Sequence, residues 1–212
     1  MKISEDNRIK KQRLENERIF IGEGGVIAVI DCELFNCTLT VSNMLLSLYR
    51  CRLYDCTILQ KNLLKNVHAF GNRYERCTFK GKFLGVDFGR DPWIDPITKT
   101  YDQLGELIDC DFTQATLDMC RFFGVDVHRQ QFAPWPQFVV PYERELTASK
   151  LRRDWPGQFA RFLSLSEDED PALSAITGTV DYFANNKKKH RGFGLTEEEL
   201  REALLDVGGV LM

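Results

Sequence analysis

The chain has 212 residues and a net charge of −3, with 43% hydrophobic and 28% charged residues. This length suits one or two domains, and this composition is typical of a chain that buries a core and stays soluble. The weak charge does not predict binding to nucleic acid through a basic surface. No apolar run predicts a membrane span or a signal peptide, so we expect a cytoplasmic protein without a membrane partner.

Within the N-terminal residues 1–26, residues 3–20 are highly charged, and Ile9, Leu14 and Ile19 are their main apolar members. Two interpretations are open for this segment: a short helix that covers the structure after it, or a frayed arm. In both cases it is an N-terminal cap or arm, and it ends at a glycine-rich turn.

An eight-residue pattern then occurs in four copies, which begin at Cys32, Cys51, Asn72 and Cys110. Each copy contains two five-residue units, in which a small residue comes two positions before a large apolar one. All seven cysteines of the chain occupy the small position. A period of five fits neither an α-helix nor a simple strand. It fits a coil of four five-residue sides, with the small and large residues pointing inward.

Over about residues 27–132 this pattern resembles the pentapeptide-repeat family. The resemblance implies a mainly β fold, a right-handed quadrilateral β-helix of about four to five coils, which we assign to residues 27–133. We expect one inward column of apolar residues, one outward ladder of threonines, and a buried His68 at a degraded centre position. The column is Leu39, Ile58, Phe79 and Leu117, and the ladder is Thr38, Thr57, Thr78 and Thr116.

The cysteines predict structural thiols rather than a reactive site. Their five-residue spacing differs from the closer pairs of zinc and redox motifs. In a reducing cytoplasm, small buried thiols stay free. We therefore expect neither a metal nor a cofactor.

An insertion interrupts the repeat at residues 89–106. The matching Thr78 and Thr116 are 38 positions apart, so with a coil of about 20 residues roughly 18 are inserted. The insertion contains Trp93 and Tyr101, and aromatic side chains are common at protein interfaces. Either they bind a partner or they fold back on the solenoid.

We expect residues 134–212 to form a largely helical region that caps the solenoid. It should contain a short strand at 138–140 and helices at 147–165 and 172–186. The clearest helix begins after Thr196, which forms a capping box with Glu199, and ends at Gly208. We expect one apolar face on this helix to pack on the solenoid, formed by Leu200, Leu204 and Leu205.

An apolar stripe is predicted on the outer surface of the solenoid. A stripe of this size is unusual on a bare monomer. The C-terminal helices, a second copy of the chain, or a partner protein should therefore cover it. The stripe consists of Leu45, Leu46, Leu48, Leu64, Val67, Val86 and Phe123. All of these except Val86, together with Trp93 and Tyr101, are the predicted partner-binding site.

No catalytic constellation is evident, so the first hypothesis is a non-enzymatic protein-binding module. The resemblance implies two precedents: bacterial immunity proteins that act as antitoxins, and DNA mimics that bind topoisomerases. Basic residues outnumber acidic ones over residues 32–82, which favours neutralisation of a toxin or enzyme over DNA mimicry. The second hypothesis is an enzyme with a site in the C-terminal region, and its only candidates are Asp181, Tyr182, His190 and Arg191.

Overall fold

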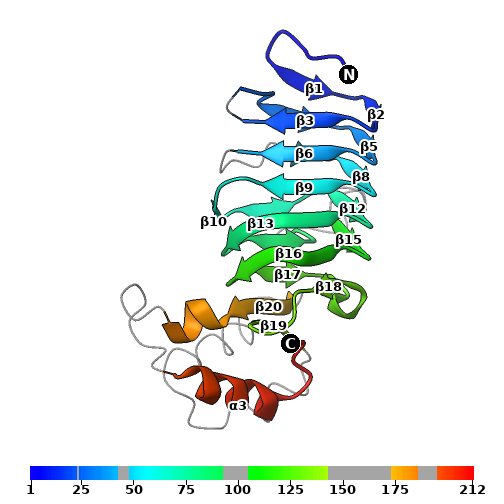
Figure 1. The fold of residues 1–212 in the computed structure, drawn as a ribbon. Helices are drawn as coiled ribbons and strands as arrows, with labels where there is room; N and C mark the ends of the chain where they lie inside the picture. The colour runs from blue at the N-terminus through cyan, green and yellow to red at the C-terminus, as the bar shows by residue number, and fades with distance from the viewer. Residues whose placement is uncertain (23, 43–47, 93–104, 143–172, 186–194) are drawn as a thin grey trace.

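The protein is a mainly β solenoid of about five turns, and one α-helix is present at the C-terminal end among the residues that the structure describes (Figure 1). The predicted fold class is thereby confirmed. Strands of successive coils stack in parallel from the N-terminal end, and the C-terminal elements lie at the other end. The computed structural model describes residues 1–22, 24–42, 48–92, 105–142, 173–185 and 195–212.

Three sides of the solenoid are built from one strand per coil. The first side carries β1 (Arg8–Lys10), β4 (Ala28–Ile30), β7 (Leu48–Tyr49), β11 (His68–Phe70), β14 (Asp87–Gly89) and β17 (Arg121–Phe123). The second carries β2 (Arg13–Glu15), β5 (Glu33–Phe35), β8 (Arg52–Tyr54), β12 (Arg73–Glu75) and β15 (Glu106–Ile108). The third carries β3 (Arg18–Ile21), β6 (Thr38–Val41), β9 (Thr57–Gln60), β13 (Thr78–Leu84), β16 (Asp111–Asp118) and β18 (Gln131–Phe132).

The fourth side is less regular than the other three. Its short strand β10 (Leu64–Lys65) pairs with the second half of β13, which bends around a corner of the solenoid. The corners between sides adopt positive φ at residues such as Asn36 and Asp55, and Asn and Asp tolerate this conformation better than most side chains do. The five-residue period therefore combines a short strand with a polar corner.

The core consists of inward columns, in which the central residue of each strand stacks on its counterpart in the next coil. On the second side, Leu34 pairs with Leu53, and Leu53 pairs with Tyr74. On the third, Leu39 pairs with Ile58, which pairs with Phe79. Because each coil satisfies the backbone groups of its neighbours, stacking forms the core and the sheets together.

All seven cysteines are free and buried, as predicted. Their thiols contact backbone groups that point into the interior; the Cys51 Sγ, for example, lies 3.3 Å from the Val29 carbonyl oxygen. Where the next coil of a column has no cysteine, an asparagine or glutamine side chain occupies the same position and binds the backbone. The Asn72 Oδ1 accepts the Cys51 N–H at 3.0 Å, and the Gln130 Oε1 accepts the Cys110 N–H at 2.8 Å.

The first coil begins earlier than predicted. Residues 8–21 form β1, β2 and β3, and not the expected helix or frayed arm. Ile9, Leu14 and Ile19 are buried as the central residues of these three strands. They are five positions apart, so the repeat continues into this segment although it contains no cysteine.

The coils differ in length, which shifts several predicted positions by one residue. Paired threonines are 19 positions apart from Thr38 to Thr57 and 21 apart from Thr57 to Thr78. A shift by one residue moves a side chain to the opposite face of a strand. Three expected central residues are therefore exposed, and each is next to the true central residue: Leu48 replaces Tyr49, Leu64 replaces Leu63, and Ala69 replaces His68.

The fourth copy of the repeat also has a different register. Phe112 stacks on Phe79 with ring centroids 4.5 Å apart, whereas Leu117 pairs with Phe83 in the next column. Thr78 pairs with Asp111, 33 positions away, which is roughly 13 more than a coil of about 20 residues. The insertion is therefore shorter than predicted, and Thr116 is not part of the threonine ladder.

An antiparallel hairpin closes the C-terminal end of the solenoid. Its strands are β19 (Gln137–Pro141) and β20 (Leu173–Thr179), and β20 also pairs with β17. The strand expected at 138–140 is confirmed, but the helix expected at 172–186 is wrong, because Leu173–Thr179 form β20 and the described helical residues begin only at Val180, before the π-helix η3 (Asp181–Asn185). The 3₁₀-helix η2 (Val127–Arg129) precedes β18. The helix expected at 147–165 lies outside the described residues.

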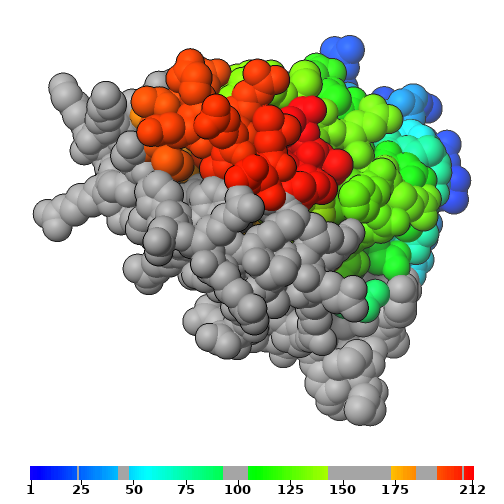
Figure 2. All heavy atoms as spheres, turned by 90° about the horizontal axis from the view of Figure 1, so that it is seen from below, coloured from blue at the N-terminus to red at the C-terminus, as the bar shows by residue number. Residues whose placement is uncertain are grey.

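The helix α3 (Glu197–Val207) has the predicted capping box and ends at Gly208. Leu200 and Leu204 pack with Phe138 and Phe183 in a small second core. Leu205 was expected on the same face but is 59% exposed. Figure 2 shows α3 and the last residues of the chain against the final coils at this end of the solenoid.

Candidate functional site: a basic face on the solenoid

The apolar stripe expected on the outer surface is not present as predicted. Leu48 and Leu64 are buried in the core because of the one-residue shift, and so is Val86. Phe123 is 1% exposed, and Val67 is partly buried against the core. The other predicted partner-binding residues lie outside the described residues, and their role remains a prediction: Leu45, Leu46, Trp93 and Tyr101.

Charges on the second side of the solenoid are balanced between neighbouring strands. The Arg52 Nη1 lies 3.1 Å from the Glu33 Oε1, and the Arg73 Nη1 lies 2.7 Å from the Glu106 Oε2. Phe35 and Tyr54 stack in the neighbouring outward column with ring centroids 4.8 Å apart. This side therefore presents no net field of one sign.

The corners that flank the second side are balanced in the same way. Arginines form two hydrogen bonds each with aspartates one coil away, as in the pairs Arg50–Asp31 and Arg76–Asp55. Hydrogen bonding to these guanidinium groups lowers the pKa of Asp31 and of Asp55. Arg129 and Asp109 repeat the arrangement in the last coil. These cations are neutralised locally.

The third side differs from the other sides over its first four coils. Its strands β3, β6, β9 and β13, together with β10 on the fourth side, contain no aspartate or glutamate. Within the described residues, no ion pair joins the basic side chains of these strands to a carboxylate. We call this outer surface, with the connection between β9 and β10, the basic face. Its cations are Arg18, Lys61, Lys65, Lys80 and Lys82.

Apolar side chains are interspersed with the cations of the basic face. Phe20 is 55% exposed and Leu63 is 46% exposed, whereas Leu59 is half-buried. The Lys61 Nζ lies 5.7 Å from the centroid of the Phe20 ring, a cation–π contact. Like charges without counter-charges do not stabilise a sheet. The basic face is therefore not explained by the stability of the fold.

A cluster of His68, Asp87 and Arg121, called here the histidine cluster, lies on the first side. His68 is exposed, contrary to the prediction, and its Nδ1 lies 2.7 Å from the Oδ2 of the buried Asp87. The Arg121 guanidinium binds the same carboxylate at 2.7 and 2.8 Å. The three side chains come from three successive coils, so the cluster fastens β11, β14 and β17 together.

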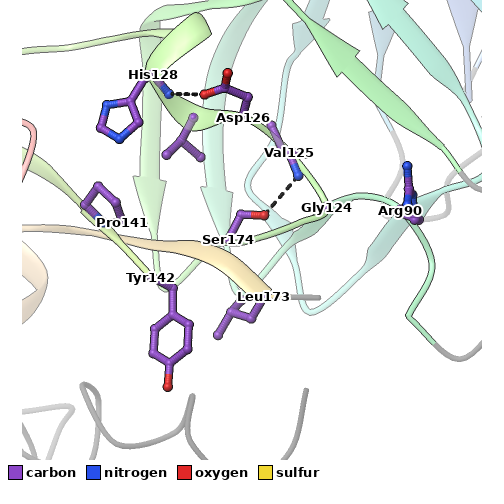
Figure 3. Close-up of a pocket in the computed structure, with 10 residues that line it drawn as sticks. Arg90, Gly124, Val125, Asp126, His128, Pro141, Tyr142, Leu173 and Ser174 are labelled. Carbon is purple, nitrogen blue, oxygen red and sulfur yellow. Dashed lines mark hydrogen bonds between the residues drawn. The ribbon is translucent and has the colours of Figure 1, made fainter. Parts of the chain in front are cut away.

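A cavity of about 530 Å³ lies between the last coil and β20 (Figure 3). Its wall includes Arg90, His128 and Tyr142. Two of its polar groups have structural roles: the Ser174 Oγ accepts the Val125 N–H at 2.9 Å, and the Asp126 Oδ1 accepts the His128 N–H at 3.1 Å. The arrangement supports the hairpin and does not suggest a reaction.

The residues considered for an enzyme in the C-terminal region do not form a described site. Asp181 is exposed, and the Tyr182 N–H donates to the Thr179 Oγ1. Burial raises the pKa of Tyr182, with a smaller effect of Asp118. His190 and Arg191 lie outside the described residues. In the part of the chain that the structure describes, no three His, Cys, Asp or Glu side chains are placed to hold a metal ion.

Among the described helices, none is long and apolar enough to span a membrane. No protein-family model matches the chain, and no curated protein matches it significantly. The function must therefore be inferred from the surface. The basic face was missed in the sequence because its members are dispersed over 65 positions, from Arg18 to Lys82, and come together only in the correct register.

Proposed function

We propose that the protein is a non-enzymatic binding module that neutralises a partner toxin or enzyme. The observation that carries this proposal is the basic face, where cations without counter-charges surround exposed apolar side chains on a rigid sheet. Exposed polar and apolar groups of this kind are features of protein interfaces. The pentapeptide-repeat resemblance adds the precedent of small immunity proteins, and a cytoplasmic location fits that role.

Three features favour binding over catalysis. Ser174 and Asp126 at the cavity, and Asp87 and Arg121 in the histidine cluster, form hydrogen bonds that hold strands or loops. A nucleophile beside an oriented base, which covalent catalysis requires, is not evident among the described residues. The solenoid offers a broad, regular surface, and such surfaces are commonly used for binding.

The alternative of a DNA mimic that binds a topoisomerase has less support. A mimic of DNA needs a row of acidic side chains that imitate phosphates. On the second side, acidic residues such as Glu33 and Glu106 are paired with arginines. The basic face carries the opposite charge.

A tagged full-length chain, used for capture from its native cells, tests the proposal. The captured protein would be identified, purified and assayed for its own activity with increasing amounts of this chain. We expect inhibition to be complete at an equimolar ratio, because a binding module acts by occupancy. Inhibition by a small fraction of an equivalent, with covalent change in the partner, would show an enzyme and contradict the proposal.

A further inference from the structure

We infer that the basic face docks onto an acidic protein surface that has an apolar centre. This inference rests on the proposed function and specifies the chemistry of the partner. It follows from the arrangement of charged and apolar side chains along the paired strands.

The centre of the basic face is one outward column. Strand pairing places Phe20 beside Thr40, Thr40 beside Leu59, and Leu59 beside Lys80. With strands about 4.8 Å apart, this column is about 14 Å long. It begins with the exposed Phe20 ring, continues through Thr40, which is 9% exposed, and the half-buried Leu59, and ends at Lys80. An apolar group of a partner can therefore be desolvated against Phe20 and Leu59.

Cations surround this column on both edges. Arg18 lies two residues before Phe20 in β3, on the edge that also carries the threonine ladder Thr38–Thr57–Thr78. On the opposite edge, Lys61 follows β9 and Lys82 lies in the second half of β13. Lys65 in β10 extends this edge onto the fourth side. An apolar centre with a charged rim is the usual anatomy of a protein interface.

A rim of one sign selects partners by charge. Carboxylates opposite the lysines would accelerate association and exclude basic surfaces, because like charges brought together at an interface cost several kcal/mol. A nucleic-acid-binding cleft is itself basic. The surface that this protein blocks is therefore not the cleft of a nuclease or a topoisomerase, but an acidic one.

Nucleic acid fits the same face less well. Non-specific binding to duplexes depends on neutralising phosphates, and Lys80 is the one cation among the four residues of the central column. A second copy of the chain is the other competing occupant, because α3 begins with Glu197, Glu198 and Glu199. Both alternatives give distinct outcomes in the experiment.

The probes are three soluble polymers: a copolymer of glutamate and tyrosine, polyglutamate, and duplex DNA. Binding to the full-length chain would be measured by isothermal titration calorimetry at low and at physiological salt. We expect the copolymer to bind more tightly than polyglutamate, and DNA to bind most weakly. DNA binding above that of both acidic polymers would overturn the inference, and so would no binding of the copolymer at low salt.

A matched pair of double variants locates the binding. Lys61→Glu with Lys82→Glu changes the basic face, and Lys2→Glu with Lys11→Glu makes the same change of charge elsewhere on exposed positions. We expect the first pair to weaken copolymer binding by about tenfold or more, and the second by less than about twofold. Equal losses would show a response to net charge alone and overturn the inference. Circular dichroism would verify that both variants are folded.

A second pair of variants tests the apolar centre. Phe20→Ser should remove the preference for the copolymer over polyglutamate and keep polyglutamate binding. Tyr49→Ser is the control, because Tyr49 is 54% exposed on the first side. If both variants keep the preference, the centre of the face makes no apolar contact and the inference fails.

Two further results separate this inference from the proposed function. If the captured partner is inhibited equally by wild type and by the Lys61/Lys82 variant, the docking surface is wrong while the function stands. If the polymers bind as expected but the captured partner keeps its activity, the proposed neutralising function is contradicted, and the inferred preference for acidic surfaces is supported. A wild-type dimer that the Lys61/Lys82 variant converts to a monomer, measured by sedimentation, would assign the face to a second copy and overturn the inference.

Discussion

Ile58 and Thr57 are neighbours in β9, but Ile58 is 6% exposed and lies inside the solenoid, whereas Thr57 lies in the outer ladder. Truncation of Ile58 to Ala removes buried methyl groups and leaves a cavity. We expect it to reduce the free energy of unfolding by about 2–5 kcal/mol. The matched Thr57→Ala should reduce it by less than about 1 kcal/mol. Urea unfolding measures both, and equal losses would contradict the register.

Two buried thiols predict a loss of stability at alkaline pH. Burial raises the pKa of Cys110 to about 11 and that of Cys120 to about 12. Below about pH 8.5 these thiols are neutral in both the folded and the unfolded chain. Above that pH the unfolded chain ionises first, so the free energy of unfolding falls as pH rises toward the folded pKa values.

Replacing both cysteines by alanine tests this effect. The double variant starts from a lower stability, but its stability should fall less steeply between about pH 8.5 and pH 11 than that of the wild type. Urea unfolding over this pH range supplies the comparison. Parallel slopes in the two proteins would show that these thiols do not titrate differently on folding.

At the scale of elements, the bend of β13 depends on Gly81. This residue has a φ of +117°, and an added Cβ would lie 2.3 Å from the Gln60 carbonyl oxygen. We expect Gly81→Ala to reduce the free energy of unfolding by about 1–3 kcal/mol. Gly24 is the control, because it also has a positive φ but a Cβ added there would meet no atom within 4 Å. Thermal unfolding should show a clearly smaller loss for Gly24→Ala.

The helix α3 offers a second matched pair. Leu204 is fully buried in the second core and Leu205 is 59% exposed. We expect Leu204→Ala to cost about 2–5 kcal/mol and Leu205→Ala about 0.5 kcal/mol or less. Hydrogen exchange of the α3 amides measures the loss locally. If Leu205→Ala is the more damaging change, another surface covers that side of the helix.

The elements also show what a sequence can predict here. The inward positions of Leu34, Leu53 and Tyr74 follow from the cysteine two positions before them or its equivalent, because the side chain at that site also points inward and contacts backbone groups of the core. The register predicted for the fourth copy was wrong. Its sequence from Cys110 to Thr116 resembles the first copies, but it lies on a different side of the coil. Counting in steps of five cannot detect a coil of 19 or 21 residues.

The candidate surface was less predictable than the fold for a related reason. The excess of basic residues is visible in the sequence, but the sequence does not show which of them form ion pairs with a carboxylate. Arg52 and Arg76 form ion pairs with carboxylates of the neighbouring coil, whereas Lys61 and Lys82 form none with the described residues. This difference depends on the stacking of coils, so it requires the exact register.

At the scale of the whole molecule, the two ends of the solenoid are protected differently. At the N-terminal end, the first-coil strands begin with Arg8, Arg13 and Arg18, and charged side chains on edge strands oppose pairing with another chain. At the C-terminal end, β20 pairs with β17 and covers its edge. The hairpin and α3 therefore act as a cap, which solenoids require for solubility.

A chain that ends at Asp170 tests the role of this cap, because it lacks both β20 and α3. The edge of β17 is then open beside Phe122, which is fully buried in the complete protein. We expect this truncated chain to associate through β17, because an open apolar edge pairs with other strands. Light scattering after size-exclusion chromatography should show oligomers. The same chain with Phe123→Lys, which places a charge on the open edge, should associate less. A monomeric truncated chain with an unchanged β spectrum would mean that the solenoid ends without need of a cap.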